Sequence, residues 1–137
     1  MNRPWLDCPI LECYEPLEKL PSSFLFIEPH PYHSIGAPYG KGLDPFCLRK
    51  TVIGCLLMAQ QELQLRSPEL QLAVFDAWRP ISVQAFMVDH AISQQCIAMG
   101  FDRYDQSKRL ALQKVIEEVE MFWAPPSFDK STPPPHS

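Results

Sequence analysis

The sequence contains no long hydrophobic run. Among its 137 residues there is no stretch of 18 consecutive apolar residues, so no segment is expected to span a bilayer. The first twelve residues include Pro4 and Asp7 and have no apolar core of the kind found in a secretory signal peptide. These two absences predict a cytoplasmic protein with no membrane partner.

Positive charge is also scarce. The chain has 12 Lys and Arg against 16 Asp and Glu, which gives a net charge of −4 at pH 7. Such a balance gives no electrostatic reason to expect nucleic acid as a partner. The hydrophobic content of 46% and the charged content of 20% are typical of a globular protein, and the length suits one domain.

The cysteines form no paired motif. There is no C-x-x-C pair and no repeated spacing that would indicate a metal knuckle or a disulfide framework. We therefore expect all of them to be reduced and assign none a chemical role. Cys55, within an apolar helical pattern, is expected to be a small buried hydrophobe. The five are Cys8, Cys13, Cys47, Cys55 and Cys96.

The stretch that organises the chain is LQLAVFDAWRP, residues 70–80. Its apolar part, 72–75, predicts a short buried strand, and its final proline predicts the start of a helix. Asp76, Trp78 and Arg79 then lie on the turn at the carboxyl end of the strand, where a rigid element can aim charge into a cleft. Asp76 can orient the guanidinium and Trp78 can wall the site. A plainer interpretation stays open: a strand-capping Asp and a surface Arg stacked on a Trp.

A second candidate segment is HPYHSIGAPYGKGLDPF, residues 30–46. Its glycines and prolines predict a structured loop that edges a pocket, with Tyr39 able to reach a substrate. His30 and His33 are three residues apart on what we expect to be a non-helical loop. No Cys, Asp or Glu lies beside them at ligand spacing, so a metal role for this pair is disfavoured.

The remaining pattern predicts one further strand and three helices. The strand is expected at 24–27, and the helices at 44–66, with Asp44 as N-cap, at 80–99, closed by a glycine, and at 105–123. Gln84, in the first turn of the second helix, could reach the same cleft as Arg79.

Taken in order, these motifs resemble the D-alanyl-D-alanine dipeptidases, the VanX-type zinc dipeptidases. The resemblance rests on GAPYG, on D-P-F-x-L-R before a helix, on F-D-A-W-R-P followed by Gln84, and on the final P-P-P-H-S. It implies that Arg79 stands in the position of the catalytic arginine and that His136 stands in that of the first zinc ligand. Asp76, Trp78, Gln84 and Tyr39 are then expected to bind or orient the substrate. Pro134 departs from members that have Ser two residues before the zinc histidine.

The family is related in fold to the DD-carboxypeptidases and the hedgehog signalling domain. The resemblance therefore implies an α+β fold, with a small, mainly antiparallel sheet flanked by about three helices. We expect a single domain over 1–137 that is incomplete at its C-terminus. Its expected parts are an N-terminal cap and loop (1–45), a helix–strand–helix–helix core (46–123) and a proline-rich connector to the metal strand (124–137).

The implied activity is zinc-dependent hydrolysis of the small dipeptide D-alanyl-D-alanine. The further zinc ligands and the general base of the family are expected beyond Ser137. The chain alone is therefore expected to be inactive, since a catalytic zinc site takes three protein ligands. Two alternatives stay open: a DD-carboxypeptidase, which the long segment 1–45 disfavours because it could close the cleft to long substrates, and a non-catalytic fragment or binding module of the same fold. The sequence predicts no oligomeric state.

Overall fold

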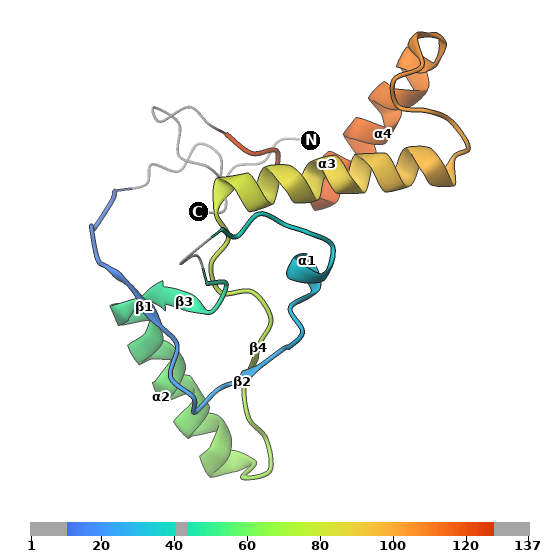
Figure 1. Ribbon diagram of the computed structural model, residues 1–137. Helices are drawn as coiled ribbons and strands as arrows, with labels where there is room; N and C mark the ends of the chain where they lie inside the picture. The colour runs from blue at the N-terminus through green and yellow to red at the C-terminus, as the bar shows by residue number, and fades with distance from the viewer. Residues whose placement is uncertain (1–10, 41–43, 128–137) are drawn as a thin grey trace. The chain divides into compact units, whose positions relative to one another are not determined.

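The computed structural model describes residues 11–40 and 44–127, and its helices and strands are labelled in Figure 1. Within these residues the chain divides into two compact units, one ending at Arg79 and the other beginning at Pro80. Each unit is described by itself below. The expectation of a single domain over the whole chain stays a prediction.

The strands of the first unit form two two-stranded sheets. β1 (Leu17–Lys19) pairs antiparallel with β3 (Cys47–Arg49), and β2 (Leu25–Phe26) pairs parallel with β4 (Ala73–Val74). The α+β class is confirmed for the described residues, and the strands expected at 24–27 and 72–75 are present in shorter form. The predicted burial of the second strand is wrong: its residues are half-buried or exposed. Within the described residues the strands form one antiparallel and one parallel pair instead of the expected single, mainly antiparallel sheet, and the relation to the DD-carboxypeptidase and hedgehog fold stays a prediction. β2 and β4 run parallel because a helical crossover joins them, as parallel pairing requires.

That crossover contains α2 (Lys50–Arg66), which begins later than expected. Asp44 does not cap the helix: its carboxylate accepts a hydrogen bond from the backbone N–H of Phe46 at 2.8 Å, which makes a local turn. The next three residues then form β3 before the helix starts. An Asp-Pro pair is equally compatible with a helix N-cap and with a turn that leads into a strand. Here the pairing of β3 with β1 favours the turn.

The core of the first unit lies between α2 and the strands. Leu20, Phe24, Phe46 and Ile53 are buried there, with Leu56, Leu57, Leu72 and Val74 packed against them. The inward face of α2 thus follows the spacing 53, 56, 57 and 60. Cys55 lies on the opposite face and is exposed, so its predicted burial is wrong.

A short helix, α1 (Pro31–Ser34), interrupts the loop that was expected to be non-helical. His30 is its N-cap residue, and a proline occupies its first position, both favourable at a helix start. Gly36 follows with φ of +87°, a conformation that glycine adopts without strain.

The second unit is helical. It contains α3 (Ile81–Ala98), the 3₁₀ turn η2 (Gln106–Lys108) and α4 (Arg109–Phe122), which confirms the two predicted helices within one to four residues at their ends. Gly100, with φ of +74°, follows the end of α3 as expected. Asp105 caps η2 rather than α4, and α3 packs on α4 through Ile92, Cys96, Val115 and Val119. None of the described helices combines the length and the apolar character that crossing a membrane would need.

Candidate functional site at the Asp76–Arg79 turn

The turn that carries Asp76 directly follows β4 and is fixed to another segment of the first unit. The backbone N–H groups of Ala77 and Trp78 both donate to the carbonyl oxygen of Pro45, at 2.8 and 3.0 Å. Pro45 itself is buried. The predicted placement of the turn at the carboxyl end of a strand is confirmed, and its backbone is anchored to that of Pro45.

Asp76 and Arg79 form a close ion pair on this turn. Nε of Arg79 donates to Oδ2 of Asp76 at 2.8 Å, and Nη2 donates to the same oxygen at 2.5 Å. The carboxylate side chain is 6% exposed and the guanidinium side chain 23% exposed. Two charge-assisted hydrogen bonds from one guanidinium fix its orientation as well as its position. The predicted contact between these two residues is thus present.

Two tyrosines from the segment around α1 complete the cluster. The hydroxyl of Tyr39 donates to Oδ1 of Asp76 at 3.2 Å, while Nη2 of Arg79 donates to the hydroxyl oxygen of Tyr32 at 3.2 Å. The guanidinium also lies 4.9 Å from the centre of the Tyr32 ring, within the range of a cation–π contact. Burial raises the pKa of both phenols, so both stay protonated at neutral pH. The two oxygens of Asp76 therefore have different partners.

His30 is packed behind this carboxylate. Its ring lies 5.3 to 5.7 Å, centre to centre, from five other rings. Nε2 lies 3.9 Å from Oδ1 of Asp76 and has no hydrogen-bond partner among the described residues. Burial is the main cause that lowers the pKa of this imidazole, against the attraction of Asp76. The five rings are those of Tyr32, His33, Tyr39, Phe46 and Phe75.

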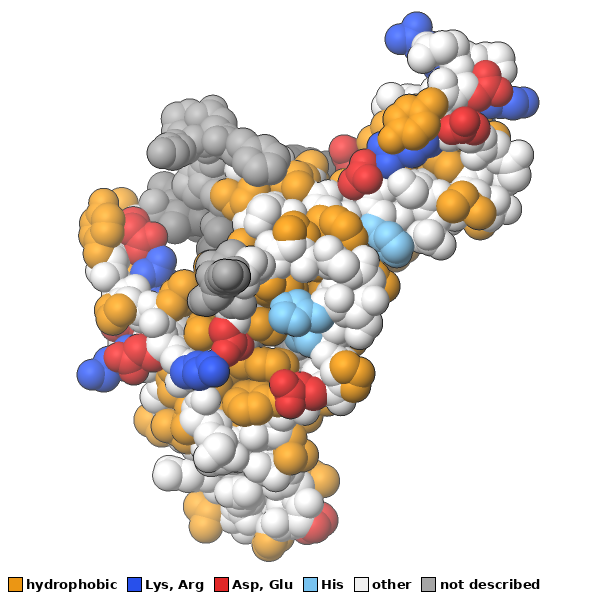
Figure 2. Space-filling view, in the orientation of Figure 1, with side chains coloured by type: hydrophobic (Ala, Val, Ile, Leu, Met, Phe, Trp, Pro, Cys, Tyr) orange, Lys and Arg blue, Asp and Glu red, His pale blue; other side chains and the backbone are white. Residues whose placement is uncertain are grey.

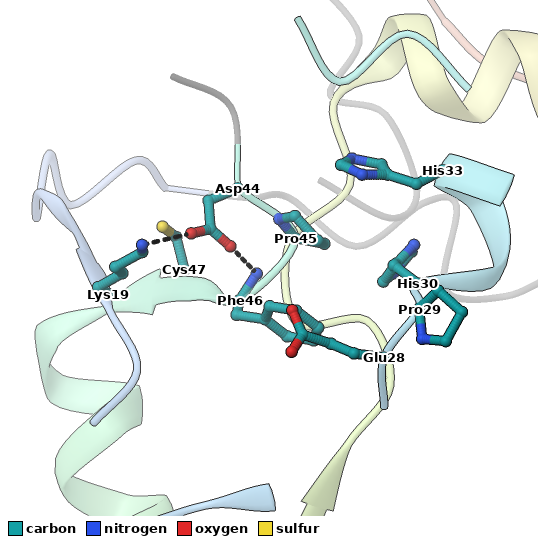
Figure 3. Close-up of a pocket in the computed structure, with 9 residues that line it drawn as sticks. All are labelled: Lys19, Glu28, Pro29, His30, His33, Asp44, Pro45, Phe46 and Cys47. Carbon is teal, nitrogen blue, oxygen red and sulfur yellow. Dashed lines mark hydrogen bonds and ion pairs between the residues drawn. The ribbon is translucent and has the colours of Figure 1, made fainter. Parts of the chain in front are cut away.

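A pocket of about 730 Å³ lies beside the cluster and shares His30 with it. Figure 3 shows Lys19 and Asp44 on one side of this pocket and the two histidines on the other. Lys19 and Asp44 form an ion pair at 3.1 Å, and burial raises the pKa of the Cys47 thiol. Figure 2 shows acidic, basic and histidine side chains gathered around hydrophobic ones on this face. The lining residues are Lys19, Glu28, Pro29, His30, His33, Asp44, Pro45, Phe46 and Cys47.

The other predicted site residues are not part of this cluster as described. Trp78 is half-buried on the turn, and its role as a wall stays a prediction. Gln84 belongs to the second unit, where it is buried and its amide donates to the carbonyl oxygen of Ala124 at 2.7 Å. Its expected reach toward Arg79 also stays a prediction. His136 lies outside the described residues.

The described residues do not fit a catalytic zinc ion. Over 11–40 and 44–127, no three His, Cys, Asp or Glu side chains converge as the ligands of a metal ion would. A catalytic zinc takes three protein ligands and leaves one position open. What the cluster does offer is a fixed positive charge with hydrogen-bond donors around it, which suits the binding of an anionic oxygen.

Comparison with known proteins gives one informative similarity. The chain is 36% identical over 136 residues, 98% of its length, to a D-alanyl-D-alanine dipeptidase of Synechocystis sp.. The predicted resemblance is confirmed. The chain spans about half, 54%, of the length of this curated relative of the dipeptidase family. No family model matches the chain. No solved structure matches it either.

Two members of the cluster were not selected from the sequence. Tyr32 and His30 stand in the same loop as Tyr39, and their residue types suit ligand contact, but nothing local pairs them with a turn more than 40 residues away. The available signal was Pro31 within HPYH, since proline is common at the first position of a helix.

Proposed function

We propose that this chain forms the arginine-bearing part of a zinc-dependent D-alanyl-D-alanine dipeptidase. The observation that carries the proposal is the guanidinium of Arg79. It is fixed by Asp76 and Tyr32 on the D-A-W-R-P turn of a chain that is 36% identical to a D-alanyl-D-alanine dipeptidase. The substrate is a small dipeptide, and no nucleic acid or membrane partner is needed.

Hydrolysis of a peptide bond builds negative charge on the carbonyl oxygen as it becomes tetrahedral. A donor aimed at that oxygen lowers the barrier, and one such donor is typically worth about 3 to 4 kcal/mol. Arg79 can supply this donor, because a guanidinium stays charged at all relevant pH values. Asp76 and Tyr32 hold it in place beforehand, so little reorganisation is needed when the charge develops.

Zinc, when bound, would supply a water molecule whose pKa is lowered to about 7 and which can therefore act as the nucleophile. We assign His136 to one ligand position. No three His, Cys, Asp or Glu side chains converge among the described residues, so these residues do not complete such a site by themselves. The part played by the described residues is to bind and orient.

The test compares two dipeptides and two proteins. Hydrolysis of D-alanyl-D-alanine and of L-alanyl-L-alanine is measured, with zinc content, on this chain joined to the remainder of the Synechocystis relative and on this chain alone. We expect the joined protein to hydrolyse the D,D dipeptide selectively. The chain alone should bind zinc no more tightly than micromolar and show no turnover, because its described residues bring no three ligands together.

Two results would contradict the proposal. One is a joined protein that takes up one equivalent of zinc and leaves D-alanyl-D-alanine intact, which would favour a binding module of the same fold. The other is zinc-dependent turnover by the chain alone, which would show that its own residues complete the metal site.

A further inference from the structure

The two ring nitrogens of His30 face two different groups. On one side, Nδ1 accepts a hydrogen bond from the backbone N–H of Tyr32 at 3.3 Å and so caps α1. On the other side, Nε2 faces Oδ1 of Asp76 at 3.9 Å. The imidazole is 3% exposed and the carboxylate 6% exposed, so both are shielded from bulk solvent.

The cap fixes which nitrogen carries the proton. A ring nitrogen that accepts a hydrogen bond has no hydrogen of its own, so the neutral imidazole carries its hydrogen on Nε2. Nε2–H is then a buried donor with no partner among the described residues. Buried donors are rarely left unpaired, so one that is points to a function or to a partner that arrives later.

One acceptor near this donor is Oδ1 of Asp76, and the backbone of Phe75 also interacts with the ring. Oδ2 takes both hydrogen bonds from Arg79, whereas Oδ1 takes the hydroxyl of Tyr39. A normal N–H···O separation is about 2.7 to 3.2 Å, so Nε2 is roughly 1 Å too far from Oδ1. Hydrogen bonds that support catalysis are often long in the free protein and shorten when the ligand is bound.

We propose that His30 is a positioning residue for Arg79: its Nε2–H donates to Oδ1 of Asp76 when the guanidinium engages an anionic oxygen. Together with Tyr39 it then fixes the plane of the carboxylate and leaves Oδ2 to Arg79. The effect on turnover rests on the proposed dipeptidase function. The geometry itself does not, and it can be measured on the chain alone.

The neutral state of His30 suits this role. A protonated imidazole would compete with Arg79 for the same carboxylate. The titratable or charged groups around the ring are those of Asp76, Arg79, His33, Tyr32 and Tyr39. Burial first, and then His33 and Arg79, lower the pKa of His30, against the opposing effects of Asp76 and the backbone of Phe75. A neutral donor orients the carboxylate and leaves its charge for the guanidinium.

Two substitutions separate the capping of α1 by His30 from its donation to Asp76. Asn is a favoured N-cap residue and can keep the hydrogen bond to Tyr32, but it is too short to reach Asp76, so His30→Asn removes only the donor. Gln is longer and can place its amide nitrogen near the position of Nε2, so His30→Gln keeps the donor and removes the cap. A purely structural role in capping α1 predicts that Gln is worse, whereas a positioning role predicts that Asn is worse.

The measurement is nitrogen-15 NMR of the 137-residue chain with and without acetate as the probe for an anionic oxygen. In the wild type we expect the His30 signals of the Nε2–H tautomer, with a slowly exchanging Nε2 hydrogen whose resonance shifts when acetate is added. The Arg79 Nε–H should exchange severalfold faster in His30→Asn than in the wild type or in His30→Gln. An Nδ1–H tautomer, an Arg79 exchange rate unchanged in His30→Asn, or a loss of protection in His30→Gln as large as in His30→Asn overturns the proposal.

The test remains decisive even if one variant does not fold. Should His30→Asn fail to fold, the tautomer and the acetate response of the wild type still decide, together with Arg79 exchange in His30→Gln. In the joined protein, His30→Asn should lower kcat roughly ten- to a hundredfold, as expected for a misplaced catalytic group, with KM little changed and rescue by Gln. If the NMR results hold but the joined protein leaves D-alanyl-D-alanine intact, the proposed function fails and the positioning stands.

Discussion

The hydroxyl of Tyr39 donates to Oδ1 of Asp76 at 3.2 Å across 37 positions of sequence. The tyrosine is 2% exposed and the carboxylate side chain 6% exposed, so the bond is shielded from water. It joins the loop after α1 to the turn after β4. The orientation of Arg79 therefore depends on a residue from a different part of the first unit.

Replacing Arg79 should separate catalysis from metal binding. In the joined protein, Arg79→Ala should lower kcat by about two to three orders of magnitude, because the donor to the developing oxyanion is lost. Zinc content should not change. The matched control is Arg66→Ala, since Arg66 also pairs with a carboxylate, that of Glu62, but is 78% exposed at the end of α2. Equal kcat values for the two variants would leave Arg79 as a surface arginine.

Removing the Tyr39 hydroxyl should weaken the fold by a measurable amount. Phe fills the same volume, so Tyr39→Phe tests the hydrogen bond to Asp76 alone, and bonds to charged groups contribute about 1.5 to 3 kcal/mol. Urea unfolding of the chain measures the free energy. Tyr104→Phe is the control: this tyrosine is 76% exposed, so a change within about 0.5 kcal/mol is expected. Similar losses in both variants would argue against a special role for the Tyr39 bond.

The buried imidazole predicts the direction in which stability changes with pH. Because the pKa of His30 is lowered from 6.5 in the folded chain, the unfolded chain binds a proton first as the pH falls. The contribution of His30 to the free energy of unfolding should therefore be fully present above pH 6.5. It should decrease as the pH falls from 6.5 to the folded-state pKa. His30→Gln, which cannot titrate, should show a smaller slope between pH 5 and 7 in urea unfolding. An unchanged slope would mean that His30 does not contribute.

The thiols should react in the order of their exposure. We expect all five cysteines to be counted as free thiols under denaturing, non-reducing conditions. In the native chain, the exposed Cys13 and Cys55 should react first with a disulfide reagent. Cys47, whose pKa is raised by burial, and the buried Cys96 should lag behind. A native count in which Cys96 reacts as fast as Cys55 would contradict the packing of α3 on α4.

Local patterns predicted the elements well where neighbours in sequence decide the outcome. The strand before Asp76, the helix after Pro80 and the close pairing of Asp76 with Arg79 all follow from residues less than ten apart. The start of α2 was not predicted correctly, because Asp44 makes a turn that leads into β3. β3 forms by pairing with β1, which lies about 30 residues earlier in the sequence.

The same limit applies to the site. Tyr39 was predicted as a site residue from a loop rich in groups that suit ligand contact, whereas Tyr32 and His30, in the same loop, were given no role in the site. Their importance comes from side chains 46 or 47 positions away, and no local periodicity carries that information. The parallel pairing of β2 with β4 likewise needs the long crossover between them, which the residues of the two short strands do not reveal.

Gln60 has a consequence for anyone who wishes to engineer this chain. Its buried amide donates to the carbonyl oxygen of Ser23 at 2.6 Å and accepts from the backbone N–H of Leu72 at 3.1 Å, so it holds the segments that lead into β2 and β4. The exposed residues 68 and 69 lie between α2 and that anchor. An epitope or fluorophore inserted there should lengthen the loop without moving Leu72. A one-residue deletion between Leu72 and Asp76 would instead reverse the direction of the Asp76 carboxylate, because side chains alternate along a strand.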